Sequence, residues 1–210
     1  MKYLKLIAVL FVGAFVVASC YKNPDLDKLQ YDFVVATDYD EEADFSSYMT
    51  YYISDTIATI TDNPRDSILV GEGATQIVNR IKSHMDSRGY QFVGIDQNPD
   101  LAMITSVIQT KNLGSVCSGW WWGYPGYYPP WWWGYPSYGY YYPFCSYYTY
   151  DIGTLNVELF DLKNVDSNQN IRVLWNDINF GVLSSYDQTN ISRSLDAIDQ
   201  AFEQSPYLEN

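Results

Sequence analysis

Residues 150–180 read YDIGTLNVELFDLKNVDSNQNIRVLWNDINF and contain the pattern that decides the fold. In residues 150–160 apolar side chains alternate with polar ones, and residues 171–180 include the run VLW. Alternation with this period, and enrichment in β-branched and aromatic residues, are typical of β-strands. The polar segment 161–170 lies between the two runs and predicts a turn. We therefore expect two strands joined as a hairpin.

Helical spacing occurs on both sides of this hairpin. In residues 74–89 the apolar side chains share one helical face, and Arg88-Gly89 supply a basic last turn and a C-terminal cap. Residues 187–204 have a second amphipathic pattern, which ends before Pro206. The apolar positions of the two faces are Ile77, Val78, Ile81 and Met85, and Ile191, Leu195, Ile198 and Phe202. Both segments are therefore predicted to be helices.

Four more segments have the composition of extended chain, namely residues 31–37, 45–53, 90–95 and 101–110. Strands on both sides of one helix, then a strand pair and a second helix, predict an α+β fold or an α/β sandwich. In either case two helices pack on a mostly antiparallel or mixed sheet. The length allows one domain, which we place at residues 31–207.

The amino terminus reads MKYLKLIAVLFVGAFVVASC. Lys2 and Lys5 form a positive n-region, and the apolar run after them is shorter than the roughly 20 residues of a membrane-spanning helix. The run ends in small residues before Cys20, which matches the lipobox of bacterial lipoproteins. We predict a signal peptide over residues 1–19, and a lipidated Cys20 with its tether over residues 20–30.

A lipid-anchored Cys20 places the rest of the chain in the cell envelope. Acyl chains such as palmitate contribute about 0.8 kcal/mol per buried CH₂ group, so lipidation alone can hold the protein on a membrane. Position 21 is Tyr rather than the Asp that favours inner-membrane retention, so we expect the outer membrane, with the domain in the periplasm or at the surface.

The chain is strongly acidic, with 25 Asp and Glu residues against 12 Lys and Arg residues. Removing residues 1–19 takes away two lysines and no acids, which changes the net charge from −13 to −15. Nucleic-acid binding is disfavoured, because it requires clustered basic side chains.

Residues 117–145 form an aromatic insert rich in Gly and Pro, in which WWWGYP at 120–125 recurs at 131–136. Cys117 and Cys145 bracket the insert. In an oxidising compartment these cysteines are expected to form a disulfide, which would stabilise the fold by about 3–4 kcal/mol on the chain-entropy model. Two separate thiols are the alternative.

The rings of the insert have two interpretations. In the first, they pack on one another and on the domain. In the second, a contiguous exposed aromatic surface contacts a membrane interface, a glycan or peptidoglycan, or a protein partner. The candidate binding residues are Trp120, Trp121, Trp122, Tyr124, Trp131, Trp132, Trp133 and Tyr135.

No catalytic or metal-binding pattern is present in the sequence. His84 is the sole histidine, which excludes multi-histidine zinc sites, and we interpret it as a surface or boundary residue of a helix rather than a base or ligand. The acidic run at Asp38, Asp40 and Glu42 has EF-hand-like spacing but lacks the glycine and glutamate that an EF-hand requires, so we expect a solvated turn. We predict no metal, no cofactor and no enzymatic activity.

The chain resembles the bacterial lipoprotein family called domain of unknown function DUF4136, over about residues 33–207. The resemblance rests on six elements in order: Asp38-Tyr39-Asp40, Ala43 to Tyr51, Asn98 to Leu101, Gly153-Thr154-Leu155 with Asp161, Leu174-Trp175, and Ile198 to Pro206. It implies a lipid-anchored α+β domain in the envelope with no established activity and no catalytic residues. The triple-tryptophan repeats flanked by cysteines depart from the family pattern.

We therefore expect a non-enzymatic envelope lipoprotein that binds a membrane, glycan or protein partner through its aromatic loop. One alternative is a structural assembly component with a self-packed loop. The other is a hydrolase that uses a pair of carboxylates, for which no spacing in the sequence indicates the pair.

Overall fold

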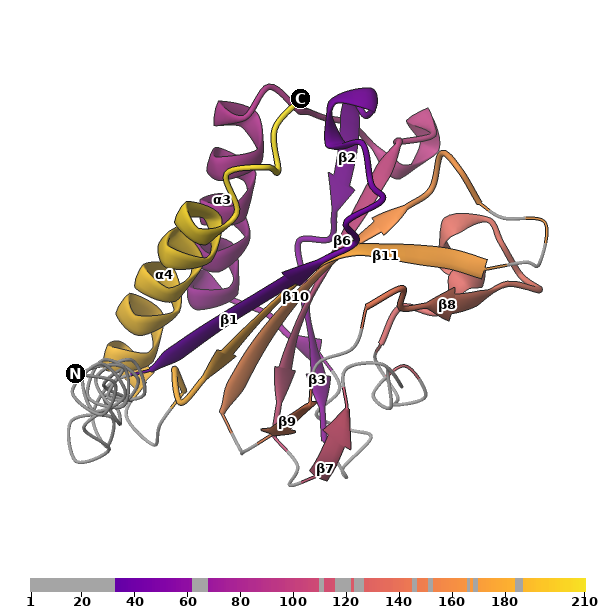
Figure 1. Ribbon diagram of the computed structural model, residues 1–210. Helices are drawn as coiled ribbons and strands as arrows, with labels where there is room; N and C mark the ends of the chain where they lie inside the picture. The colour runs from indigo at the N-terminus through magenta and orange to yellow at the C-terminus, as the bar shows by residue number, and fades with distance from the viewer. Residues whose placement is uncertain are drawn as a thin grey trace, which may run out of the picture. The chain divides into compact units, whose positions relative to one another are not determined.

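A mixed β-sheet forms the centre of the domain, with helices on one face and the aromatic insert on the other (Figure 1). The computed structural model describes residues 33–61, 68–109, 112–115, 122, 127–144, 147–150, 153–165, 167, 170–183 and 187–210. Within these residues the sheet has nine strands in the order β1-β11-β10-β6-β2-β5, with β3 also beside β6, β4 beside β3 and β8 beside β11. The strands are β1 (Val34–Tyr39), β2 (Thr50–Ile53), β3 (Ile57–Ile60), β4 (Ile68–Leu69), β5 (Gln91–Phe92), β6 (Leu101–Ile108), β8 (Gly139–Tyr141), β10 (Thr154–Asp161) and β11 (Asn170–Phe180).

The predicted hairpin is confirmed as the antiparallel pair β10 and β11. Leu155 lies opposite Asn179 and Val157 lies opposite Asp177, with a bulge between Leu159 and Phe160. β10 also pairs antiparallel with β6, while β6 pairs in parallel with β2 and β3. The sheet is therefore mixed, as the α+β prediction required.

Two α-helices, α3 (Glu72–Ser87) and α4 (Asp187–Gln204), cover one face of the sheet (Figure 1). The apolar face predicted for α3 is buried, and Ile81 and Met85 are fully enclosed. Burying a side chain of this size stabilises the fold by about 1.5–3 kcal/mol. Phe202 of α4 packs against Trp175 of β11, with ring centroids 5.4 Å apart. Both predicted helices are confirmed.

His84 lies at the contact between the two helices. Its Nε2 is 2.7 Å from Oδ1 of Asp199, and Arg80 Nη1 is 2.6 Å from Oδ2 of the same carboxylate. The imidazole ring also stacks on Phe202 at 4.5 Å. These side chains join α3 to α4.

Gly153 shows why the Gly-Thr-Leu element begins with glycine. Its φ is +95°, and a Cβ atom at this position would lie 2.1 Å from the carbonyl oxygen of Leu183. Its own carbonyl accepts a hydrogen bond from the Leu183 amide at 3.1 Å. Only glycine permits this close crossing of two chain segments.

A separate two-stranded ladder lies at the base of the aromatic insert, formed by β7 (Asn112–Ser115) and β9 (Tyr147–Tyr150). The strands are antiparallel, with Asn112 opposite Tyr150 and Ser115 opposite Tyr147. The sequence patterns did not predict this pair.

The predicted signal peptide (1–19), the lipidation site Cys20 with its tether (20–30), and both Cys117 and Cys145 lie outside the described residues. Within the part of the chain that the structure describes, no helix has the length and apolarity needed to cross a membrane.

Candidate functional site

The described part of the aromatic insert packs on the sheet face opposite the helices. Tyr127, Trp133 and Tyr142 are buried there, with exposed fractions of 5%, 7% and 5%. They belong to a second apolar core with side chains of β3, β6, β10 and β11, among them Phe160 and Ile171. For these rings the insert packs on the domain.

A buried carboxyl group, that of Glu158 on β10, attaches the insert to the sheet. Tyr127 donates its hydroxyl hydrogen to Oε2 at 2.6 Å, and Tyr142 donates to Oε1 at 2.6 Å. The indole N–H of Trp122 also donates to Oε1, at 3.3 Å. Both carboxyl oxygens of Glu158 thus accept hydrogen bonds from side chains of the insert. Glu158 is fully buried, and such a group is stable in a core only when hydrogen-bonded.

The titration of Tyr127 reflects this environment. Burial, followed by the negative charge of Glu158, raises the pKa of the Tyr127 hydroxyl well above its usual value. The phenol therefore remains a hydrogen-bond donor throughout the physiological pH range. The bond that holds the insert does not depend on pH through this group.

Further hydrogen bonds fix the geometry of the insert. The indole N–H of Trp133 donates to the Tyr140 hydroxyl, which donates in turn to the carbonyl oxygen of Tyr128, both at 2.6 Å. Tyr135 donates to the carbonyl oxygen of Leu162 at 2.9 Å. The short 3₁₀ helix η6 (Pro130–Trp133) is therefore joined to β8 and to the end of β10.

Two tryptophans of η6 remain exposed on this fixed base. Trp131 is 59% exposed and Trp132 is 43% exposed, with ring centroids 6.1 Å apart and ring planes at 62°. The ring of Tyr128 meets Trp132 edge-on at 5.4 Å and lies 6.0 Å from Trp133. We call Trp131 and Trp132 the exposed tryptophan pair.

The structure divides the eight predicted binding residues into four groups. The exposed tryptophan pair faces solvent, Trp133 is buried, and Trp122 and Tyr135 are half-buried. Trp122 stacks on Tyr142 at 5.3 Å, in addition to its bond to Glu158. The remaining three, Trp120, Trp121 and Tyr124, lie outside the described residues.

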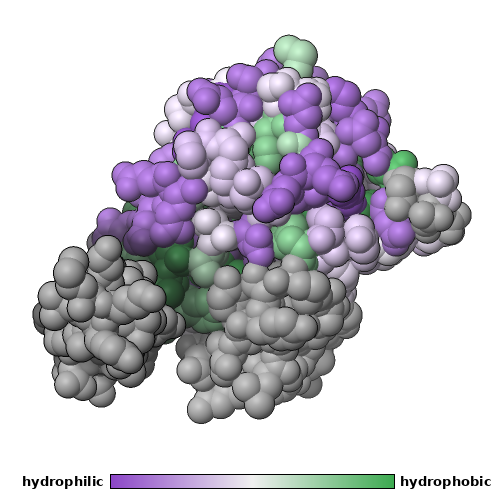
Figure 2. All heavy atoms as spheres, in the orientation of Figure 1, coloured by the Kyte–Doolittle hydropathy of each residue, from purple (hydrophilic) through white to green (hydrophobic). Residues whose placement is uncertain are grey.

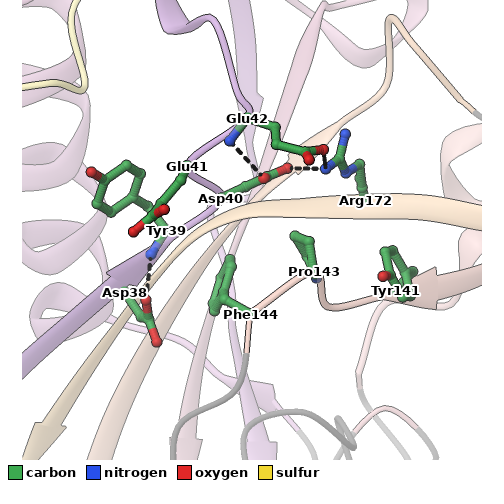
Figure 3. A pocket seen from close by; sticks show the side chains of 9 residues that line it. All are labelled: Asp38, Tyr39, Asp40, Glu41, Glu42, Tyr141, Pro143, Phe144 and Arg172. Atoms are coloured by element: carbon green, nitrogen blue, oxygen red, sulfur yellow. Dashed lines mark hydrogen bonds and ion pairs between the residues drawn. The ribbon is translucent and has the colours of Figure 1, made fainter.

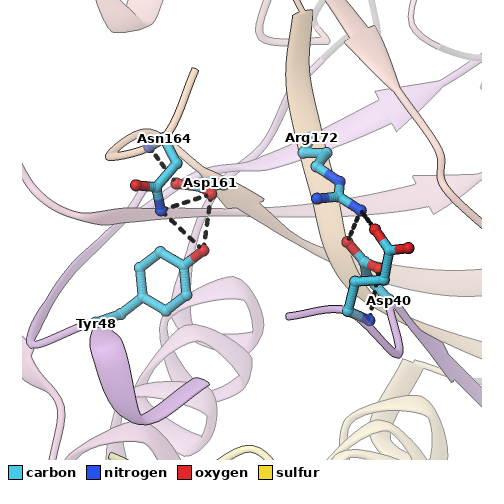
Figure 4. Close-up of polar contacts among 6 residues, drawn as sticks. Asp40, Tyr48, Asp161, Asn164 and Arg172 are labelled. Carbon is cyan, nitrogen blue, oxygen red and sulfur yellow. Dashed lines mark hydrogen bonds and ion pairs between the residues drawn. The ribbon is translucent and has the colours of Figure 1, made fainter. Parts of the chain in front are cut away.

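An acidic pocket of about 430 Å³ opens where the acidic turn after β1 faces the end of the insert (Figure 3). Its lining residues are Asp38, Tyr39, Asp40, Glu41, Glu42, Tyr141, Pro143, Phe144 and Arg172. Nη2 of Arg172 lies 2.7 Å from Oδ2 of Asp40 and 3.1 Å from Oε2 of Glu42 (Figure 4). Asp40 is only 3% exposed, and its ion pair with Arg172 holds the turn in place. The turn is therefore not fully solvated as the sequence suggested.

This arrangement accounts for the spacing that resembles an EF-hand. Oδ1 of Asp40 accepts the amide N–H of Glu42 at 3.0 Å, which is a local turn bond, while Oδ2 pairs with Arg172. Across the described ranges, no cluster of three or more His, Cys, Asp or Glu side chains could hold a metal ion. The acids of the turn act here on the conformation of the chain.

A second polar cluster joins the turn after β10 to the short helix η1 (Phe45–Ser47). Tyr48 donates its hydroxyl hydrogen to Oδ2 of Asp161 at 2.7 Å, and Oδ1 accepts the amides of Lys163 and Asn164 (Figure 4). Burial, then the hydrogen bond to Asp161, raises the pKa of Tyr48 above its usual value. Asp161 therefore stabilises a turn.

A smaller pocket of about 260 Å³ lies between the insert, the turn after β10 and the connection before β6. It is lined by Ile95, Asn98, Pro99, Asp100, Trp133, Tyr135, Leu162 and Lys163. No sequence pattern singled out this pocket, because its walls come from three distant parts of the chain.

Figure 2 shows that hydrophilic residues cover most of the described surface in that view, with smaller hydrophobic patches between them.

Comparison with known proteins agrees with the fold. The family model described as domain of unknown function (DUF4136) matches residues 35–207. The crystal structure of a DUF4136 family protein from Bacteroides thetaiotaomicron VPI-5482 is 32% identical, with a TM-score of 0.74, and the match covers 85% of this chain and 98% of that one. A PDZ domain protein from Parabacteroides distasonis ATCC 8503 is 15% identical, with a TM-score of 0.43, over 85% of this chain and 37% of that one. No curated protein matches.

Proposed function

The chain belongs to the DUF4136 family, and from this premise we propose that it is a lipid-anchored, non-enzymatic envelope protein that binds a partner through the exposed tryptophan pair. The lipobox before Cys20 supports the anchor and the outer-membrane location. The geometry of the insert supports the binding role.

One observation carries the binding proposal. Trp131 and Trp132 stand exposed on a loop whose base is held by three hydrogen bonds to the buried Glu158. Rigid aromatic side chains contribute large contact area at low entropic cost, and tryptophan is enriched among the residues that dominate binding energy. A loop fixed in this way presents its two indoles in one geometry before the partner arrives.

The exposed tryptophan pair and the start of β1 lie towards opposite ends of β11. β1 begins at Val34 opposite Phe180, whereas β8 pairs with Asn170 at the other end of β11. At about 3.3 Å per residue, these two ends of β11 are roughly 33 Å apart. A chain anchored at Cys20 enters the domain at β1, while η6 is bonded to β8. The pair therefore lies towards the end of the sheet that is remote from the entry of the tether.

The packing of Tyr127, Trp133 and Tyr142 favours a second function, that of a structural assembly component with a self-packed loop. This alternative requires that the exposed pair contributes nothing to binding. We do not propose hydrolysis, because Asp40 and Glu42 of the acidic pocket are both paired with Arg172.

The double variant W131A/W132A tests the proposal. The full chain in detergent micelles is passed over immobilised envelope polysaccharide and envelope protein fractions. Loss of one dominant aromatic contact costs about 2 kcal/mol, so retention should weaken at least about 30-fold. The variant L69A/V70A, which truncates two exposed apolar residues outside the insert, is the matched control. Equal retention of W131A/W132A and wild type would reject the binding role and favour the structural one.

We also propose that Cys117 and Cys145 form a disulfide. The supporting observation is that β7 and β9 are antiparallel neighbours, with Ser115 opposite Tyr147. In the sequence, Cys117 follows Ser115 by two residues and Cys145 precedes Tyr147 by two residues. Directly opposed residues of an antiparallel pair have Cα atoms about 4.5–5.5 Å apart. A disulfide accepts Cα separations of about 4.4–6.8 Å.

A further inference from the structure

We propose that the 260 Å³ pocket beside the insert binds one pyranose ring of a neutral polysaccharide. This inference rests on the proposed binding function and names the chemical class of the partner. It is carried by the walls of the pocket, its unused polar groups, its size and the charge of the protein.

The walls suit the apolar face of a sugar ring. Trp133 and Tyr135 contribute aromatic surface, and Ile95, Pro99 and Leu162 contribute aliphatic surface. The C–H bonds on one face of a pyranose carry partial positive charge, and an aromatic face is negative, so the two attract one another. The hydrogen bonds from Trp133 to Tyr140 and from Tyr135 to Leu162 hold both rings in place.

The rim supplies the donors and acceptors that sugar hydroxyls require. The exposed amide of Asn98 has no hydrogen-bond partner among the described residues. Asp100 uses Oδ2 to accept the amides of Met49 and Thr50, at 2.7 and 3.2 Å, and Oδ1 has no protein donor in the described ranges. Lys163 donates one ammonium hydrogen to the carbonyl oxygen of Ser47 at 2.6 Å, and its other two hydrogens remain for a ligand.

Asn98 has a backbone conformation that sets its side chain at the rim. Its φ is 51°, and among the described residues it is the one non-glycine residue with positive φ. Asn tolerates this left-handed region better than most residues, although the conformation still costs energy. The strained residue is thus also the one that carries an unused amide into the pocket rim.

The volume of the pocket and the net charge of the protein limit the class of ligand. A volume of about 260 Å³ lies just below the range of roughly 300–1,000 Å³ that holds a drug-sized ligand, so one ring fits and a folded peptide does not. The net charge of −13 repels polyanions such as acidic polysaccharides. The ligand is therefore a neutral sugar chain rather than an acidic one.

The pocket and the exposed tryptophan pair are connected through ring contacts of Tyr128. The ring of Tyr128 contacts both Trp132, at 5.4 Å, and Trp133, at 6.0 Å. A polysaccharide with one ring in the pocket can therefore place neighbouring rings near the exposed pair. This accounts for a small pocket and two exposed indoles on the same loop.

Affinity electrophoresis tests this proposal. The full chain in detergent is run in native gels that contain dextran, mannan, galactomannan or β-glucan, with polygalacturonate as the anionic comparison. At least one neutral polysaccharide should retard the wild type. I95W, which places a large ring at the mouth of the pocket, should weaken that binding at least tenfold. N98G keeps the positive φ but removes the amide, and should weaken binding about three- to tenfold. V70W adds the same ring at a distant exposed position and should leave binding unchanged.

The outcomes separate this inference from the proposed function. If a neutral polysaccharide binds, and I95W and N98G bind as the wild type does while W131A/W132A does not, the pocket assignment is wrong and the binding function stands. If no neutral polysaccharide binds but the protein fraction retains the chain through the tryptophan pair, the partner is a protein and the pocket assignment is again wrong. If neither fraction shows dependence on the pair or the pocket, both proposals fail.

Discussion

We predict that substitution of Glu158 destabilises the domain, because this residue attaches the insert to the sheet. E158L replaces the carboxyl group by an apolar side chain of similar size and leaves the hydroxyls of Tyr127 and Tyr142 without their acceptor. Both hydroxyls donate at 2.6 Å from buried positions. A buried donor that is left without an acceptor costs about 1–3 kcal/mol, so the two hydroxyls together give about 2–6 kcal/mol. This is a large part of the roughly 5–15 kcal/mol that stabilises a typical domain.

Urea unfolding at neutral pH, followed by tryptophan fluorescence, measures this loss. E158Q keeps one oxygen acceptor and should lose less, about 1–3 kcal/mol. Y127F removes one donor and leaves the rest of the site intact. If the two residues act through one bond, the double variant E158L/Y127F should lose less than the sum of the single variants, by about 1.5–3 kcal/mol.

A second readout follows the loop itself. Detachment of the insert should make the six tryptophans of the segment more accessible to an aqueous quencher in E158L than in the wild type. The reasoning would be refuted if E158L lost less than about 1 kcal/mol and its effect were additive with that of Y127F. Glu158 would then be a buried carboxyl group with no part in holding the insert.

Three further predictions concern other parts of the domain. Burial raises the pKa of Asp177 well above its ordinary value of 3.8. Between the two pKa values the folded state keeps a proton that the unfolded chain releases. The free energy of unfolding therefore falls as pH rises above about 4, by up to about 1.4 kcal/mol per pH unit. D177N has no such proton. In urea unfolding, the stability of D177N relative to the wild type should therefore show no gain near pH 3 and an increasing gain towards pH 7. Parallel plots of the free energy of unfolding against pH for the two proteins would contradict this. G153A places a Cβ atom 2.1 Å from a carbonyl oxygen and should lose at least about 3 kcal/mol, whereas G181A, with open space around it, should lose about 1–2 kcal/mol; equal losses in thermal unfolding would contradict the steric reason. For the disulfide, mass spectrometry after alkylation should find Cys117 and Cys145 blocked before reduction and free after it, and two alkylated thiols before reduction would exclude the bridge.

The elements with strong periodicity were predictable from the chain. Both helices and the hairpin of β10 and β11 occur where the patterns indicated. The apolar positions that give α3 its periodicity are buried, and β10 is buried at every position. The short strands were not predictable in the same way. β8 has three residues and pairs in parallel with β11, a contact between segments about 30 residues apart that leaves no local pattern.

The candidate site was predicted in part. The aromatic composition identified the insert, but consecutive tryptophans have different environments: Trp131 and Trp132 are exposed and Trp133 is buried. Arg172 was not expected beside Asp40, because the two residues are 132 positions apart in the sequence. The small pocket could not be found from sequence, because its walls meet only after folding.

The sequence by itself determined the α+β class, the positions of the helices and the hairpin, and the aromatic character of the insert. These depend on local periodicity and composition, which neighbouring residues carry. The lipobox at Cys20 stays a prediction from the sequence. Only the tertiary structure decided that Glu158 is buried. Side chains alternate between the two faces of the sheet along β10, so Glu158 lies on the face opposite Val157, and the insert covers that face. Whether a residue is buried depends on the chain that packs against it. Here that chain is the aromatic insert, and the sequence pattern of the insert does not specify which face of the sheet it covers. The same long-range packing determined which of the described indoles remain exposed.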